Sequence, residues 1–158
     1  MKIFDALKEI NIKTGIKFDV ITLDNRIFFQ KTVFLLKYFN FKGARKYDFN
    51  IYLHGPYSAD LAHEYLIKGR WKLRYAKSKN QVNDNTIELI KQILLKFDDP
   101  KKEIKFLEAL TTLLSLSSEF NLPVDALFKA KTLKPYMEDS IWEESINFIN
   151  INKIWKPN

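Results

Sequence analysis

The sequence predicts an α+β fold that is mostly α-helical, with a small two- or three-stranded sheet in its N-terminal half and a C-terminal helical bundle. Apolar residues recur at helical spacing over most of the chain, whereas period-two alternation is confined to 47–54 and 71–76. The 158 residues, 46% of them apolar, suffice for one domain with a sizeable core. We therefore expect a single domain over 1–158, with a first part over 1–80 and a helical part over 84–156.

Two helices are predicted at the start of the chain, over 3–13 and 26–39. The first has an apolar stripe at helical spacing and meets Gly15, a residue that favours helix ends. The second is preceded by Asp24 and Asn25, either of which can cap it. Because apolar residues surround this second helix, we expect it to be largely buried.

The stretch YDFNIYLHGPYS, residues 47–58, predicts a strand that ends in a sharp turn. Apolar and polar residues alternate over 47–54, which places one face toward the core. Gly55 and Pro56 follow, and this pair is typical of a turn because glycine adopts backbone angles that few other residues tolerate. We therefore place the end of the strand at Gly55.

A helix and a second strand are expected after this turn. Ser58 is a good N-cap for a helix over 59–68, and Gly69 is expected to end it. The alternation over 71–76 then predicts the second strand. The predicted order in the N-terminal part is thus helix, helix, strand, helix, strand.

The C-terminal part is predicted to be entirely helical. A polar segment over 77–86 separates it from the N-terminal part. Apolar stripes and helix-breaking prolines then delimit four helices, of which the second is expected to be central. These helices are predicted over 86–97, 101–119, 123–132 and 138–155.

Two segments resemble the SocA-like antitoxin, or Panacea, superfamily. FFQKTVFLLKYF (28–39) and YDFNIYLHGPYSADLAHEYLIKG (47–69) show the family's Gln-Lys step on a helix and its aromatic strand ending in Gly-Pro-Tyr-Ser. The runs at 106–116 and 133–149 are similar to its helical remainder. The resemblance implies a winged-helix-like N-terminal part and no catalytic residue. Members are antitoxins, proteolysis adaptors, phage-encoded proteins or uncharacterised proteins. The matching residues are Gln30, Lys31, Gly55, Pro56, Tyr57 and Ser58.

We expect these motif residues to form one structural unit rather than a reactive site. A lysine on a mostly buried helix must reach solvent or find a partner, so Lys31 is predicted to pair with Asp48 or Asp60. Tyr57 is expected to pack against the turn, and Ser58 to cap the following helix.

Charge and cysteine content limit the environment of the protein. The net charge of +7 divides into +6 over 1–47, +3 over 48–83 and −2 over 84–158. This asymmetry favours a polyanion-binding face, although a basic composition is also typical of AT-rich genomes. The chain has no cysteine, no membrane-length apolar run and no secretory signal at its N-terminus. We therefore expect a cytoplasmic protein.

The residue patterns give little support for catalysis. HEYLI, residues 63–67, begins like the zinc-protease motif HExxH, but Ile67 stands where the second histidine ligand is needed. The GPYS stretch lacks the GxSxG elbow of serine hydrolases. Four glycines cannot build a phosphate-binding loop in this arrangement. We expect no enzyme, no cofactor and no metal site.

Nucleic acid is one class of partner that the sequence leaves open. Basic residues interleave with aromatic ones after Gly69, and as a wing they would contact phosphates. The preceding helix presents Asp60 and Glu64, which repel phosphates and disfavour reading of DNA bases by this helix. The candidate residues for nucleic-acid binding are Arg70, Lys72, Arg74, Lys77 and Lys79.

A protein partner is the class that the sequence favours. Tyr52, Tyr57 and Trp71 are candidate contact residues, because aromatic side chains are enriched at interfaces. The alternative is that these aromatics pack in the core or at its edge. The resemblance implies a toxin or protease machinery as the partner, and the oligomeric state stays open.

Overall fold

The computed structural model describes residues 2–158, which form seven α-helices, one short 3₁₀ helix and one two-stranded antiparallel sheet. This confirms a mostly helical α+β fold with a small sheet. The elements are α1 (Ile3–Thr14), α2 (Leu23–Tyr38), η1 (Lys42–Ala44), β1 (Asn50–Tyr52), β2 (Gly55–Tyr57), α3 (Ala59–Tyr75), α4 (Asp84–Leu94), α5 (Pro100–Ser115), α6 (Pro123–Leu133) and α7 (Asp139–Asn152).

The first two helices form where apolar spacing predicted them. Gly15 ends α1 in the left-handed region, with φ of 78°, and its N–H donates to the Asn11 carbonyl. The cap of α2 is Thr22, whose hydroxyl accepts from the Asn25 N–H at 3.1 Å. The predicted caps, Asp24 and Asn25, therefore lie inside the helix, because a residue just before them supplies the oxygen.

The GPYS stretch lies in a strand of a hairpin rather than at a turn after one. β1 pairs antiparallel with β2, and Tyr52 lies opposite Gly55. Leu53 and His54 therefore connect the strands, two residues earlier than predicted. Gly55 supplies the unusual backbone at the start of β2, with φ of 88°. The predicted strand over 47–54 is thus shortened to three residues, and its turn begins inside it.

The helix that follows is much longer than predicted. Ser58 caps α3 as expected, accepting from the Leu61 N–H at 3.4 Å. Gly69 does not end this helix but lies inside α3. Its small size suits the close packing there, because an added Cβ would come within 3.3 Å of Val20. The predicted strand over 71–76 is wrong, since 71–75 continue α3. A short alternation of large apolar and basic residues is compatible with both the two-residue period of a strand and the 3.6-residue period of a helix. In the structure these residues are helical.

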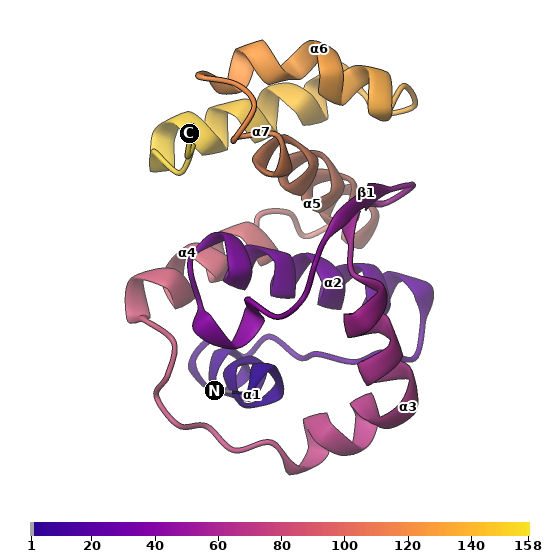
Figure 1. Ribbon diagram of the computed structural model, residues 1–158, viewed down its shortest axis with the longest axis vertical. Coiled ribbons are helices and arrows are strands. Elements are labelled where there is room, and N and C mark those ends of the chain that lie inside the picture. Colours follow the sequence, from indigo (N-terminus) through magenta and orange to yellow (C-terminus); the bar gives the residue numbers. More distant parts are fainter. Residues whose placement is uncertain (1) are drawn as a thin grey trace.

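The C-terminal helices surround α5, which contacts α2, β2, α4, α6 and α7. Figure 1 shows α6 and α7 on one side of α5, and α2 and the hairpin on the other. Asp99 caps α5 and Pro100 occupies its first turn. The predicted central position of this helix is confirmed. The hairpin consequently lies where the N-terminal and C-terminal parts of the chain meet.

Within residues 2–158, none of the helices has both the length and the apolar content that crossing a membrane requires.

Gly55→Ala tests the constraint at the start of β2. The added Cβ would lie 3.1 Å from Thr112 Oγ1 and 3.4 Å from Lys31 Cε, at a φ that L-residues avoid. We expect the free energy of unfolding to fall by about 1–3 kcal/mol, measured by urea denaturation. Gly15→Ala is the matched control, because Gly15 also has positive φ but open space around it. An equal or smaller loss at Gly55 than at Gly15 would contradict the packing argument.

Candidate functional site

The predicted motif residues lie together and join α2 to the hairpin and to α3. The Gln30 side chain pairs with the backbone of Ser58 in both directions, since Nε2 donates to the carbonyl and Oε1 accepts from the N–H, each at 3.0 Å. Lys31 Nζ donates to the Pro56 carbonyl at 2.7 Å. Gln30, Lys31 and Ser58 are all buried. The Gln-Lys step on α2 thus satisfies backbone groups that the hairpin would otherwise leave unpaired.

Lys31 does not have the partner that the sequence suggested. Asp48 lies 3.5 Å from Lys37 instead, and Asp60 is exposed at the start of α3. The carboxylate that acts on Lys31 belongs to Glu108 on α5. Sequence spacing could not indicate this residue, because it lies far along the chain and approaches only when α5 packs on α2.

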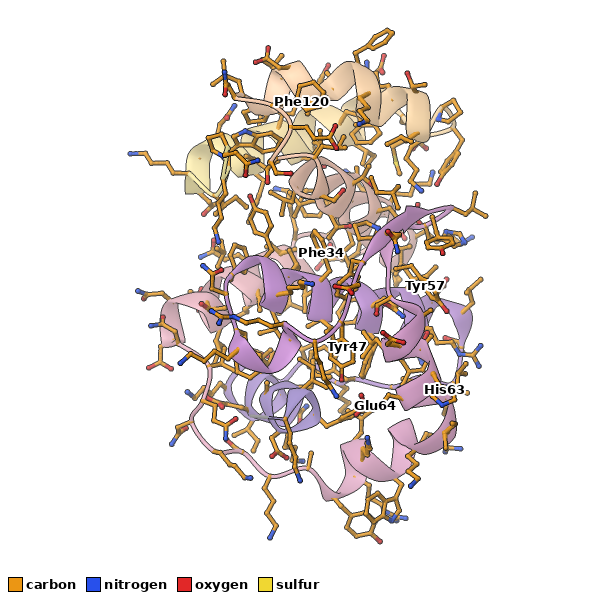
Figure 2. All side chains as sticks on the ribbon, in the orientation of Figure 1. Phe34, Tyr47, Tyr57, His63, Glu64 and Phe120 are labelled. Atoms are coloured by element: carbon orange, nitrogen blue, oxygen red, sulfur yellow. The ribbon has the colours of Figure 1, made fainter. Side chains whose placement is uncertain are left out.

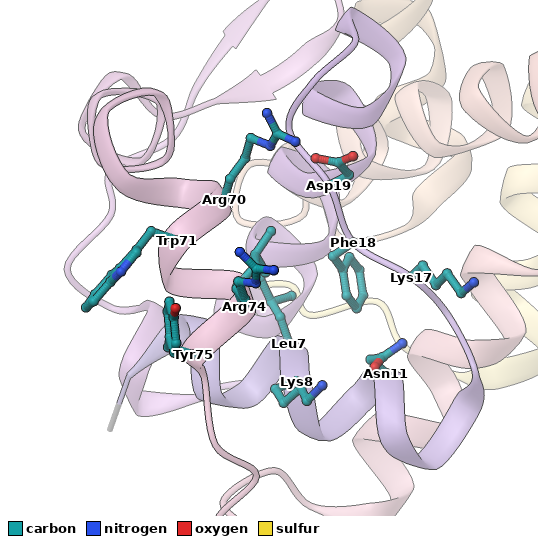
Figure 3. Close-up of a pocket in the computed structure, with 11 residues that line it drawn as sticks. Leu7, Lys8, Asn11, Lys17, Phe18, Asp19, Arg70, Trp71, Arg74 and Tyr75 are labelled. Atoms are coloured by element: carbon teal, nitrogen blue, oxygen red, sulfur yellow. The ribbon is translucent and has the colours of Figure 1, made fainter.

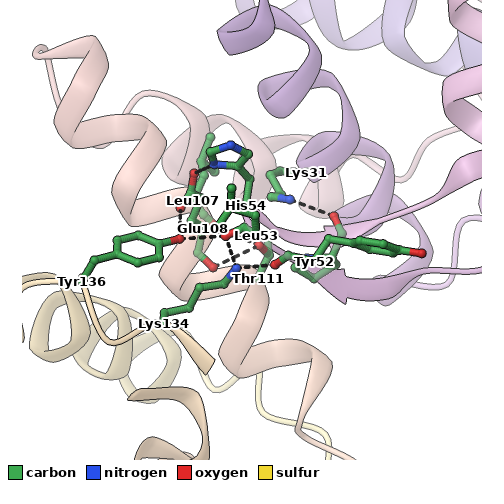
Figure 4. Close-up of polar contacts among 10 residues, drawn as sticks. Lys31, Tyr52, Leu53, His54, Leu107, Glu108, Thr111, Lys134 and Tyr136 are labelled. Atoms are coloured by element: carbon green, nitrogen blue, oxygen red, sulfur yellow. Dashed lines mark hydrogen bonds and ion pairs between the residues drawn. The ribbon is translucent and has the colours of Figure 1, made fainter. Parts of the chain in front are cut away.

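A second set of side chains holds the tip of the hairpin (Figure 4). Lys134, at the end of α6, donates to the carbonyls of Tyr52 and Leu53. The Tyr136 hydroxyl lies 2.7 Å from the Leu53 carbonyl oxygen and 3.2 Å from Glu108 Oε2. The hairpin is therefore fastened by α2 on one side and by the connection between α6 and α7 on the other.

His54 completes this polar cluster. Its Nδ1 lies 2.8 Å from Glu108 Oε1, so Glu108 contacts both His54 and Tyr136. Sequence analysis singled out neither Glu108 nor Lys134 nor Tyr136 as a site residue. Two signals in the sequence could have indicated them. Glu108 lies within the apolar run of the helix expected to be central, and Lys134 lies directly before Pro135.

Burial shifts the proton equilibria of this cluster. Lys31 is 2% exposed, and burial lowers its pKa from 10.5 to about 7, with Lys134 lowering it further and Glu108 opposing the shift. Burial and the nearby Glu108 raise the pKa of Tyr136 to about 12. A lysine with such a pKa could serve as a nucleophile. Here Nζ is directed at the Pro56 carbonyl, so the cluster acts chiefly to bind the hairpin backbone.

The hairpin and the two helices beside it enclose an apolar groove of about 330 Å³. Leu53 stands at its edge with 70% of its surface exposed, and Leu23 and Leu66 are also exposed there. The rings of Tyr52 and Tyr57 lie 5.3 Å apart in an edge-to-face arrangement on the same groove. Both tyrosines were predicted contact residues. The three leucines were not predicted, because Leu53 and Leu66 fit the inward faces of a predicted strand and helix, and Leu23 lay between predicted elements.

A larger hollow of about 770 Å³ lies at the opposite end of α3, between α3, α1 and residues 17–19. Figure 3 shows Arg70 and Arg74 on the side of α3 that faces Phe18, and Trp71 and Tyr75 on the neighbouring side. Arg70, Arg74 and Trp71 were predicted site residues, and the structure gathers them here. Trp71 therefore does not join Tyr52 and Tyr57 at the groove.

The other predicted basic residues are not part of this hollow. Lys72 pairs with Glu64 at 2.5 Å, and Glu64 also accepts from the Tyr47 hydroxyl at 2.7 Å (Figure 2). The three donors, which include Lys46, lower the pKa of Glu64 to about 2 against the opposing effect of its burial. The prediction that all five basic residues form one wing is wrong, because 71–75 are helical and carry their side chains around α3.

The polar segment after α3 is likewise tied to α1. Lys79 lies 3.3 Å from Asp5, which also accepts from the Lys77 backbone N–H at 3.0 Å. These contacts fix the start of the connection to α4. Lys77 itself is exposed but does not line the hollow.

No group of three or more histidine, cysteine or acidic side chains in residues 2–158 is arranged to hold a metal ion. His63, the first residue of HEYLI, is exposed on α3, and Ile67 is exposed one turn further along. His54 contacts Glu108.

Lys31→Met tests whether this lysine titrates within the fold. Between pH 7 and 10.5 the unfolded chain holds a proton that the folded chain releases, so Lys31 makes stability rise with pH over this range. We expect the difference in unfolding free energy between wild type and Lys31→Met to shift in favour of the wild type by about 2 kcal/mol from pH 7 to pH 9. Thermal and urea denaturation at both pH values measure it. Exposed Lys101→Met is the control, and a flat difference for Lys31→Met would refute the assignment.

Comparison of the chain with protein-family models, curated proteins and solved structures gave no match. The resemblance to SocA-like antitoxins therefore stays a prediction that depends on the Gln-Lys step and the GPYS stretch. The geometry of the groove and of the hollow carries the functional argument.

Proposed function

We propose that this protein is a non-catalytic protein-binding module of the antitoxin or adaptor type, which receives apolar side chains of its partner in the groove beside the hairpin. The observation that carries this proposal is the exposure of Leu53, Leu23 and Leu66 around one groove. Exposed apolar groups that gather around a concavity mark interaction sites more often than apolar groups scattered singly. A toxin or a component of protease machinery is the partner that the resemblance suggests.

The rigidity of the hairpin supports this proposal. Leu53 is exposed at a connection of two residues, yet Lys134 and Tyr136 both contact its carbonyl. Because these contacts fix the backbone at Leu53, the hairpin loses little backbone freedom when a partner binds. The groove is therefore preorganised, and binding to it costs less conformational entropy than binding to a flexible loop would.

The polar groups near the groove favour binding over catalysis. Lys31 donates to Pro56, and Glu108 contacts His54 and Tyr136. These contacts occupy the side chains that a general base or nucleophile would need free.

The absence of cysteine and of a membrane-length apolar run supports a cytoplasmic location for the module.

The finer architecture belongs to the same proposal. The three helices α1, α2 and α3, together with the hairpin, support a winged-helix-like description of residues 1–80. The hairpin precedes α3 here, so it is not a wing placed after a recognition helix. The packing of α6 and α7 on α5 supports a helical bundle over 84–156.

Photo-crosslinking from the groove tests this function. With p-benzoylphenylalanine at position 53, we expect a discrete protein crosslink in nuclease-treated cells of the native host. The matched control is position 151 on α7, where Ile151 is 79% exposed. Leu53→Asp should then weaken binding of the captured protein by about 30-fold or more, as expected at the centre of an interface. Equal crosslinking from position 151, or an unchanged affinity of Leu53→Asp, would refute the groove as the binding site.

A further inference from the structure

The C-terminal half of α3 carries two rows of side chains that folding does not explain. Arg70 and Arg74 are four residues apart and share one side of the helix, and Trp71 and Tyr75 share the next. Trp71 is 63% exposed and Tyr75 is 59% exposed, with their ring centres 5.1 Å apart. The helix thus presents a basic row beside an aromatic row.

Like charges four residues apart repel each other along a helix, so the two arginines disfavour each other. More than half of each aromatic side chain stays exposed to solvent. Within residues 2–158, neither arginine lies within 4.0 Å of a carboxylate, whereas the neighbouring Lys72 and Lys79 each have one. Among the described residues, Lys68, Arg70 and Arg74 are the basic side chains of α3 without such a partner, and the two arginines line the hollow.

Two further lysines bring their charge to the same hollow. Lys8 lines it from α1, and Lys17 lines it from the segment between α1 and α2. Asp19 is the one carboxylate among the lining residues that the structure describes, and its Oδ1 accepts from the Val20 N–H at 2.6 Å. The hollow consequently combines four basic side chains with an aromatic edge.

We infer that this hollow binds single-stranded nucleic acid, with phosphates on Arg70, Arg74, Lys8 and Lys17 and unpaired bases on Trp71 and Tyr75. Basic grooves flanked by exposed aromatic rings bind single strands because every unpaired base offers a face for stacking. In a duplex these faces are stacked on one another. The exposed carboxylate of Asp60 in the first turn of α3 also disfavours placing this helix in a major groove.

This site is separate from the proposed protein-binding groove. The groove contacts α3 through Tyr65 and Leu66, whereas the hollow contacts it from Arg70 onward. Failure of one proposal therefore leaves the other intact, and variants of one site serve as controls for the other.

Fluorescence anisotropy with a labelled 15-nucleotide oligothymidylate measures this binding on the full chain. We expect a dissociation constant of about 1–100 µM at physiological salt, and tighter binding at low salt. The slope of log affinity against log salt should be about −3, because four contacts to a single strand each contribute about −0.7. A duplex of equal length and a 15-residue polyglutamate serve as competitors, and both should compete at least tenfold less well.

Two variants with matched controls assign the residues. Arg70→Ala with Arg74→Ala should reduce the slope to about −1.4, whereas Lys101→Ala with Lys102→Ala, which changes net charge equally on α5, should not. Trp71→Ala should lower affinity about 5- to 100-fold, whereas Phe128→Ala, which removes an 84% exposed ring on α6, should not. Melting temperatures verify that each variant folds.

Each other outcome overturns the inference in a defined way. Equal competition by the duplex would exclude recognition of single strands, and equal competition by polyglutamate would indicate an acidic protein partner instead. Equal losses in the control variants would show a diffuse charge effect without a site. A wild-type protein that does not bind the oligonucleotide at low salt refutes the proposal without any variant.

Discussion

The hydrogen bond from Lys31 to the Pro56 carbonyl, with the paired contacts of Gln30 to Ser58, is the interaction on which the remaining structure depends. Hairpins of three-residue strands have few cross-strand bonds of their own and are marginal in isolation. This one is held because two neighbouring residues of α2 satisfy backbone groups of β2 and of the first residue before α3. The groove, the start of α3 and the packing of α5 on the hairpin all require that position.

The sequence was informative where a local signal determines local structure. Gly15 ends a helix, Ser58 caps one, and the apolar spacing identifies α5 as central, because backbone preference and hydrophobic periodicity act over a few residues. The expectation that Gln30, Lys31 and the GPYS stretch form one unit agrees with their hydrogen bonds. That expectation followed from the need of a buried lysine for a partner, but the partner is the Pro56 carbonyl and not the predicted Asp48 or Asp60.

The sequence failed where distant contacts decide between local alternatives. Residues 71–75 alternate like a strand but are helical, since they continue the helix that Ser58 caps. Lys134 acquires its role from the hairpin carbonyls of Tyr52 and Leu53, and Glu108 from His54 and Tyr136, all of them distant in the sequence. Of the five predicted basic residues, Arg70 and Arg74 reach a common hollow and Lys72 is neutralised by Glu64. Charge counting cannot distinguish a free basic residue from a paired one.

The position of Lys134 and Tyr136 has a consequence for the order of events during synthesis. Both residues contact the hairpin tip, yet they follow it by about eighty positions in the chain. While the ribosome is still making α5, the tip lacks these donors and Leu53 is held only from the side of α2. The groove therefore reaches its final shape only after the α6–α7 connection has left the ribosome, when most of the domain already exists.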